Sequence, residues 1–109
     1  MEVSAVQTTI VAMPVRLSTD LDDDRAVPYF LWDEPMTVAQ LRERLAGASP
    51  PERRRLLGKI LREARDTDVW RFTTPRDVQA DWEGLSAHLG RRRAFWEYLF
   101  GHWRAAGLL

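Results

Sequence analysis

Two segments of the chain combine a helix N-terminal signal with apolar residues at helical spacing, and this pattern constrains the fold more than any other feature. Thr37, with Gln three positions later, matches a capping box, and the apolar residues that follow end at Gly47. Pro50 follows a serine and suits the first helical position, where its missing N–H has no intrahelical partner to lose. The sequence therefore predicts helices over residues 37–46 and 50–66.

A third helix start lies at Thr74, which is followed by proline and by an aspartate in the first turn. One predicted face then carries four apolar residues at helical spacing: Val78, Trp82, Leu85 and Leu89. We expect this face, Trp82 included, to be part of the core. Gly90 is expected to end the helix.

The last predicted helix runs from about residue 91 to 106 and is unusually rich in aromatic side chains. Its apolar face is too wide for a simple surface helix. That face is either central to the core or in part an interface, and the core interpretation is favoured because exposed apolar surface of this size is uncommon.

These patterns predict a mainly α protein, a single small helical domain of about four helices. The chain of 109 residues has room for one core, and 45% hydrophobic residues with five tryptophans are typical of a folded domain. We assign residues 28–109 to the helical domain and residues 1–27 to an extended acidic arm, β-prone over residues 8–17. Residues 69–73 are also β-prone, as a connector or one strand.

The net charge of zero hides an uneven distribution along the chain. Residues 1–36 carry two arginines against seven acids, so the remainder is basic by the same amount. The acids concentrate at Asp20, Asp22, Asp23 and Asp24, just before the aromatic residues Tyr29, Phe30 and Trp32. Because aromatic residues often dominate interface energies, we expect these seven residues to form the contact with a protein partner.

Two arginine triplets are further candidates for contact with nucleic acid or a partner: Arg53, Arg54, Arg55, Arg91, Arg92 and Arg93. Each triplet lies at a predicted helix start, where the helix dipole disfavours cations, so a counter-charge is plausible. Phosphate, a partner's carboxylates and the acidic arm could each supply it, while a solvated surface remains the simplest interpretation. Residues 37–66 could also form a DNA-binding helix-turn-helix, with residues 69–73 as its wing.

The sequence contains little that catalysis or metal binding would need. The absence of cysteine excludes thiolate chemistry, and the aspartates fail an EF-hand count because Arg25 stands where that loop needs glycine. His88 and His102 have no further ligand at metal-binding spacing. We therefore expect no enzyme, no metal site and no cofactor.

The N-terminal stretch matches neither a membrane span nor a signal peptide, because its uncharged run contains several polar residues and no basic residues precede it. Together with the missing cysteines, this favours a cytoplasmic protein with no membrane contact. The oligomeric state is left open.

The run Tyr29-Phe30-Leu31-Trp32-Asp33, the segment Asp68-Val69-Trp70-Arg71-Phe72 and the ending Gly90-Arg91-Arg92-Arg93-Ala94-Phe95-Trp96 carry a resemblance over residues 28–109. In these three segments, the chain resembles small bacterial proteins encoded beside nucleotidyltransferase toxins of the abortive-infection type. The resemblance implies an antitoxin that inhibits such a toxin by direct contact. A DNA-binding regulator and a structural subunit of a larger assembly are the alternatives.

Overall fold

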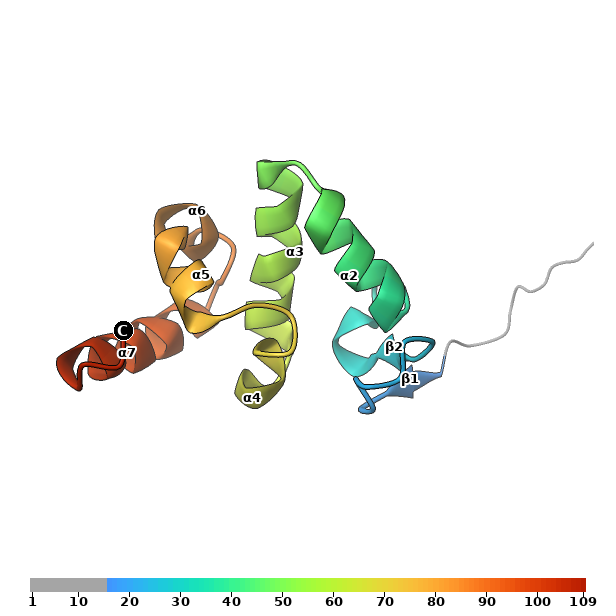
Figure 1. Ribbon diagram of the computed structural model, residues 1–109, viewed down its shortest axis with the longest axis horizontal. Coiled ribbons are helices and arrows are strands. Elements are labelled where there is room, and N and C mark those ends of the chain that lie inside the picture. The colour runs from blue at the N-terminus through green and yellow to red at the C-terminus, as the bar shows by residue number, and fades with distance from the viewer. Residues whose placement is uncertain (1–15) are drawn as a thin grey trace, which may run out of the picture. The chain divides into compact units, whose positions relative to one another are not determined.

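The computed structural model describes residues 16–109, so most of the predicted β-prone segment at residues 8–17 lies outside it (Figure 1). The described part of the chain divides into two compact units, one that ends at Val38 and one of residues 39–109. The division therefore falls eleven residues later than the predicted boundary at residue 27. Each unit is described by itself below.

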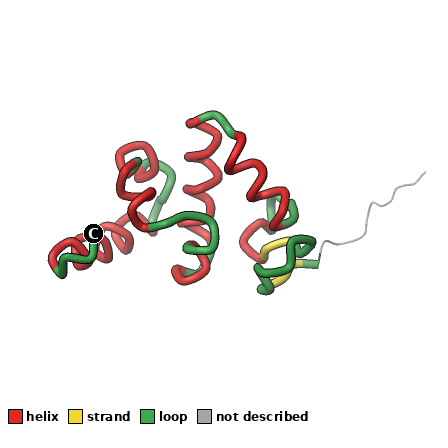
Figure 2. Tube along the Cα trace, in the orientation of Figure 1, coloured by secondary structure: helices red, strands yellow, loops and turns green. Residues whose placement is uncertain are grey.

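The described part of the first unit contains two very short strands and a 3-10 helix. β1 (Leu17–Ser18) pairs in parallel with β2 (Val27–Pro28), with Leu17 opposite Val27, and η1 (Tyr29–Leu31) follows directly (Figure 2). Four apolar side chains of this unit are buried: Leu21, Phe30, Leu31 and Met36. The unit thus folds around apolar residues placed between its charged ones.

The second unit is helical throughout, which confirms the mainly α prediction. Its helices are α2 (Val38–Gly47, whose first residue belongs to the first unit), α3 (Pro50–Glu63), α4 (Asp66–Val69), α5 (Pro75–Ala80), α6 (Trp82–Ser86) and α7 (Arg92–Ala105). The predicted end at Gly47 holds, whereas α6 ends at Ser86, four residues before the predicted end at Gly90. Gly90 takes the left-handed φ of 53° that favours glycine.

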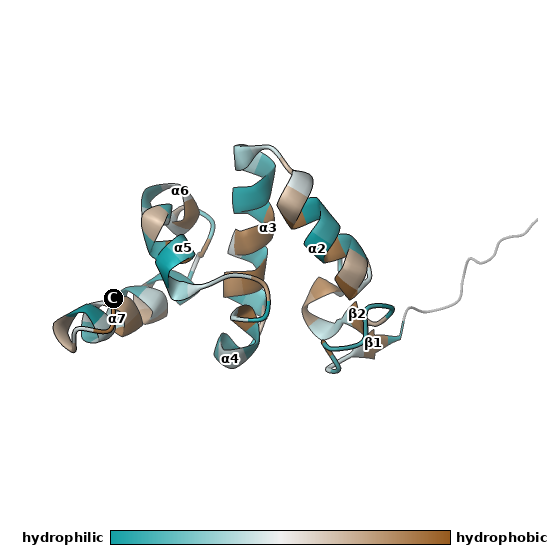
Figure 3. Cartoon of the chain, viewed as in Figure 1, coloured by the Kyte–Doolittle hydropathy of each residue, from teal (hydrophilic) through white to brown (hydrophobic). Residues whose placement is uncertain are grey.

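The helix α3 supplies much of the core of the second unit. Residues 56–61 are all buried, and the helix packs against α4 and α6. Figure 3 shows its first turns coloured hydrophilic and its later turns largely hydrophobic. At Gly58 the backbone lies so close to His88 that an added Cβ would collide with the His88 Cβ. The missing side chain of Gly58 therefore sets how closely the two segments approach.

Aromatic rings hold α7 against the rest of the unit. Trp96 is fully buried, stacks with Phe100 at 5.7 Å between ring centroids and meets Trp70 edge-on at 5.6 Å. Its indole Nε1–H donates to the carbonyl oxygen of Leu61 at 2.9 Å. Leu61 lies in the last turn of α3, where carbonyls have no intrahelical partner, so Trp96 satisfies one of them.

The third predicted helix is interrupted, so the prediction of one continuous helix from Thr74 to Gly90 is wrong. Thr74 caps α5 as expected, its hydroxyl accepting from the Asp77 N–H at 3.1 Å. At Asp81 the backbone leaves the helical region, and α6 begins at the next residue. Val78, Leu85 and Leu89 are buried as predicted, but Trp82 is only half-buried and packs edge-on against Phe100 at 5.5 Å.

The prediction of an extended segment over residues 69–73 is also wrong. Val69 ends the helix α4 and is fully buried, and the next three residues form turns. The Arg71 N–H donates to the Asp68 carbonyl and the Phe72 N–H to the Val69 carbonyl. Trp70 packs against two rings of α7, and this tertiary contact overrides the local β preference.

Ser49 directly precedes α3, but its side chain makes no capping hydrogen bond.

Candidate partner-binding surface

The acidic segment is a chain of turns rather than the extended arm that the sequence predicts. The Ser18 hydroxyl accepts from the Asp20 N–H at 2.9 Å, and the Asp20 carboxylate accepts from the Asp22 N–H at 3.2 Å. The Asp23 carboxylate accepts from the Arg25 N–H at 3.0 Å. Short polar side chains that satisfy nearby N–H groups stabilise turns, and here they fold the segment back on itself.

The acidic loop, residues 20–24, exposes most of its carboxylates but buries its one apolar residue, Leu21. The side chain of Leu21 is buried, whereas Asp20, Asp22 and Asp24 are exposed and Asp23 is half-exposed. Asp23 also lies 3.8 Å from the exposed Arg25 guanidinium. Three carboxylates are thus presented to solvent by a loop that its own turns and Leu21 hold in place.

The three predicted aromatic contacts have different environments. Phe30 is buried, so the prediction that its side chain forms a partner contact is wrong for this conformation, because it belongs to the core. Tyr29 is half-buried and meets Phe30 edge-on at 5.3 Å. Trp32 is 62% exposed. Among the three, Trp32 therefore offers the largest exposed aromatic surface in the same unit as the acidic loop.

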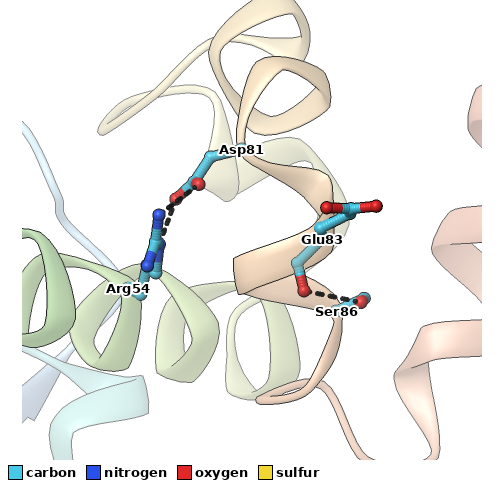
Figure 4. Close-up of polar contacts among 4 residues, drawn as sticks. All are labelled: Arg54, Asp81, Glu83 and Ser86. Carbon is cyan, nitrogen blue, oxygen red and sulfur yellow. Dashed lines mark hydrogen bonds and ion pairs between the residues drawn. The ribbon is translucent and has the colours of Figure 1, made fainter.

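The first arginine triplet points in three directions, as consecutive helical residues must. Arg54 forms a two-pronged pair with Asp81, at 2.8 Å from Nε to Oδ2 and 2.9 Å from Nη2 to Oδ1 (Figure 4). Arg55 pairs in the same way with Glu52 of its own helix. Arg53 is exposed. Of the three, Arg53 is the best placed to meet a ligand.

The Arg54–Asp81 pair shifts the pKa of both of its members. Its hydrogen bond is the largest cause that lowers the pKa of Asp81 below the ordinary 3.8, with the charges of Arg54 and Arg53 adding to it and partial desolvation opposing it. The same hydrogen bond raises the pKa of Arg54. Arg54 also lies over Gly84 of α6, where any Cβ would collide with its guanidinium. Arg54 therefore joins α3 to the start of α6.

The second triplet is also largely engaged within the protein. The Arg92 guanidinium lies 4.8 Å from the centre of the Phe95 ring and 5.8 Å from that of Trp96. Arg93 pairs with Glu97 one turn further along α7, at 3.2 Å. Arg91 is exposed at the start of the helix. Arg93 therefore finds its counter-charge in its own helix, and Arg92 lies over aromatic rings, so the acidic loop supplies neither contact.

The predicted wing of a helix-turn-helix does not form, because residues 69–73 are turns beside α4 rather than a strand. The second helix of that motif would be α3, of which residues 56–61 are buried. A recognition helix must present a face to the major groove, whereas the exposed positions of α3 lie in its first turns and at its last residue, Glu63.

A pocket of about 460 Å³ lies within the second unit where the first turns of α3 approach α5. Its walls combine the apolar Leu45, Leu57 and Phe72 with charged Arg53 and Asp77. The Arg54–Asp81 pair closes one side. Its cations and carboxylates balance, so the pocket favours neither sign of ligand.

The two histidines are separated in the structure. His88 follows α6, with its Cβ against Gly58, while His102 is exposed on α7 and stacks on Tyr98 at 6.2 Å. Within residues 16–109, no three histidine, aspartate or glutamate side chains are grouped so that they could hold a metal ion.

No helix in this described part of the chain is long and apolar enough to cross a bilayer. Comparison with known proteins finds no match for the chain among protein-family models, curated proteins or solved structures.

Proposed function

We propose that the protein is a non-catalytic binding protein that acts in the cytoplasm as an antitoxin and inhibits a nucleotidyltransferase toxin by direct contact. The observation that carries the proposal is the exposure of Trp32 in the same compact unit as the exposed carboxylates of the acidic loop. An aromatic anchor contributes binding energy, and clustered negative charge steers association with a basic surface.

The expected partner surface is basic because nucleotidyltransferases bind triphosphate and RNA, both polyanions. The exposed carboxylates of Asp20, Asp22 and Asp24 would occupy such a surface in place of phosphates. The turns formed by Asp20 and Asp23 fix the loop before binding, which lowers the entropy cost of association.

The proposal is tested by replacing all four loop aspartates with asparagine. Asparagine keeps a side-chain oxygen that can accept the same turn hydrogen bonds, so the charge is removed while the loop is kept. The probe is the purified product of the neighbouring gene, which the proposal requires to be a nucleotidyltransferase. Association is followed by surface plasmon resonance at low and physiological salt. We expect the association rate to fall about tenfold or more at low salt and less at physiological salt.

A matched control removes four exposed acids from the second unit instead, through Glu43→Gln, Asp66→Asn, Asp77→Asn and Glu83→Gln. The two variants have the same net charge, so a difference between them reports the position of the charge. Trp32→Ala should raise the dissociation rate of the complex. Equal association of the loop variant and the control would contradict the proposal.

The alternative of a DNA-binding regulator is separated in the same preparation by an electrophoretic shift assay on the chain's own promoter. Binding through Arg53 and its neighbours would collapse as salt rises, because phosphate contacts release counterions. Sequence-specific binding at physiological salt that is lost on Arg53→Ala would favour the regulator over the antitoxin.

A further inference from the structure

The helix α7 has a second face that the core does not use. Trp96 and Phe100 are buried on one side, while Ala94, Tyr98 and Ala105 are exposed on the other. Gly101 completes this outer face and is half-buried. Tyr98 is 72% exposed, more than any other large hydrophobic residue in the described part of the chain. A large ring among small residues gives this face a projection beside a hollow.

The four outer-face residues, Ala94, Tyr98, Gly101 and Ala105, are spaced by four, three and four positions. This is the spacing of a coiled-coil seam, and it is symmetric about the midpoint of the set. A second helix of the same sequence, running in the opposite direction, would place Tyr98 opposite Gly101 and Ala94 opposite Ala105. Each ring would then meet the hollow that the partner's glycine leaves.

We propose that the outer face of α7 docks against the same face of a second copy of this chain, with the two helices antiparallel. The flanks of the seam support this occupant. Glu97 and Arg104 lie on one flank, one heptad apart, so the antiparallel arrangement brings each Glu97 to the Arg104 of the other copy. On the other flank, Phe95 meets the partner's His102 by the same symmetry.

The existing partner of Glu97 does not prevent a contact with a second copy. Glu97 pairs with Arg93 within the helix at 3.2 Å, and both side chains are about half-exposed. An exposed pair of this kind contributes little to stability, so Glu97 can exchange it for the partner's Arg104. An isologous contact, in which one patch meets its own copy, is the commonest way that proteins form dimers.

The size of the contact sets the concentration at which the dimer forms. The helix has fourteen residues, which corresponds to a length of about 21 Å. One pair of such helices buries a small interface, so we expect a reversible dimer whose population rises with protein concentration. The proposal does not depend on the nucleotidyltransferase contact, because it concerns a different unit of the chain.

The chain lacks cysteine, which permits a direct test of direction and register. Two full-length single variants, Ala94→Cys and Ala105→Cys, are oxidised separately and as a mixture. In the antiparallel dimer, two copies of one variant hold their thiols about 16 Å apart, beyond disulfide reach, whereas the mixture brings them opposite each other. We expect crosslinked dimer from the mixture and little from either variant alone.

A parallel pairing, or any contact through another surface, would give a different result. Efficient crosslinking of Ala94→Cys alone would overturn the antiparallel arrangement. A chain that sediments as a monomer up to about millimolar concentration, where weak association would be visible, would overturn the proposal as a whole.

A second variant tests the hollow at Gly101 without threatening the fold. A Cβ at this position would meet only the flexible end of Arg104, at 3.9 Å. Gly101→Gln should therefore leave the thermal midpoint of the monomer unchanged or higher, while filling the space that the partner's Tyr98 needs. We expect sedimentation equilibrium to show association at least about tenfold weaker, and unchanged association would count against the seam.

Exchanging the charges of Glu97 and Arg104 provides a control whose result depends on contact with a second copy. Arg104→Glu sets like charges across the seam and should weaken the dimer, and adding Glu97→Arg to the same chain should restore it. Arg76→Glu makes the same charge change at an exposed site on α5 and should have no effect. Failure of the double variant to recover would show that Glu97 and Arg104 do not meet across the interface.

Discussion

Arg54 and Asp81, 27 positions apart in the sequence, form a two-pronged ion pair that fixes the start of α6 against α3. The pair coincides with the interruption between α5 and α6, where the Asp81 backbone leaves the helical region. Gly84 lies directly beneath the Arg54 side chain. One salt bridge and one glycine therefore lie at the point where the third predicted helix divides.

Removing Arg54 should lower stability, whereas removing its neighbour Arg53 should not. Arg54→Met keeps much of the aliphatic length but leaves the Asp81 carboxylate without its two-pronged partner. Arg53→Met removes the same charge from an exposed position. Thermal melts at neutral pH should show a lower midpoint for Arg54→Met alone. Equal midpoints would mean that the pair does not hold α6.

The Arg54–Asp81 pair also predicts a pH dependence. Because the folded pKa of Asp81 lies below its ordinary value of 3.8, the pair stabilises the protein above that pH. The contribution is lost as pH falls through the folded pKa. The free energies of unfolding of the parent and of Asp81→Asn should therefore differ at pH 6 and converge as the pH falls below 3.8 and through the folded pKa of Asp81. A difference that stayed constant over this range would contradict the assignment.

Local chemistry predicted three helix boundaries correctly, whereas the features that the sequence did not predict lie at long-range contacts. Gly47, Pro50 and Thr74 act on neighbouring backbone, so their effects can be read from the sequence. At the break, Asp81 pairs with Arg54, and at the turn, Trp70 packs against rings about 30 positions later in the chain; neither contact can be read from local sequence.

The candidate contact surface was predictable only in part, for the same reason. The exposure of the carboxylates follows from charge, since a cluster of like charges resists burial. The burial of Phe30 and the exposure of Trp32 do not follow, because these two aromatic residues have similar character and only packing distinguishes them. The outer face of α7 was concealed within one wide apolar pattern, which the structure divides into a buried face and an exposed one.

Trp96 and Trp82 should respond differently to replacement by phenylalanine. Trp96→Phe removes the buried Nε1–H that bonds the Leu61 carbonyl, and leaving that oxygen unpaired should cost about 1–3 kcal/mol. Trp82 is half-buried, and Trp82→Phe should cost less than about 1 kcal/mol. Urea unfolding followed by circular dichroism measures both. A larger loss at Trp82 would mean that α6 is packed differently from this structure.

Replacing either of two helix glycines, Gly101 or Gly58, with alanine should change the free energy of unfolding, in opposite directions. Alanine has the higher helix propensity, by about 1 kcal/mol, so Gly→Ala is stabilising wherever space allows. At Gly101 of α7 a Cβ meets nothing closer than 3.9 Å, and Gly101→Ala should stabilise by about 0.5–1 kcal/mol. At Gly58 of α3 the new Cβ would collide with the His88 Cβ, which sits next to the backbone and cannot rotate away.

Gly58→Ala must therefore move α3 and the His88 segment apart, and overpacking of this kind costs about 1–3 kcal/mol, more than the propensity gain. Both free energies of unfolding should be measured at low protein concentration, so that association through α7 does not contribute. His88→Ala retains the Cβ and should leave the loss at Gly58 in place, whereas His88→Gly should relieve it. A stabilising Gly58→Ala would show that α3 and the His88 segment are not in contact at this point.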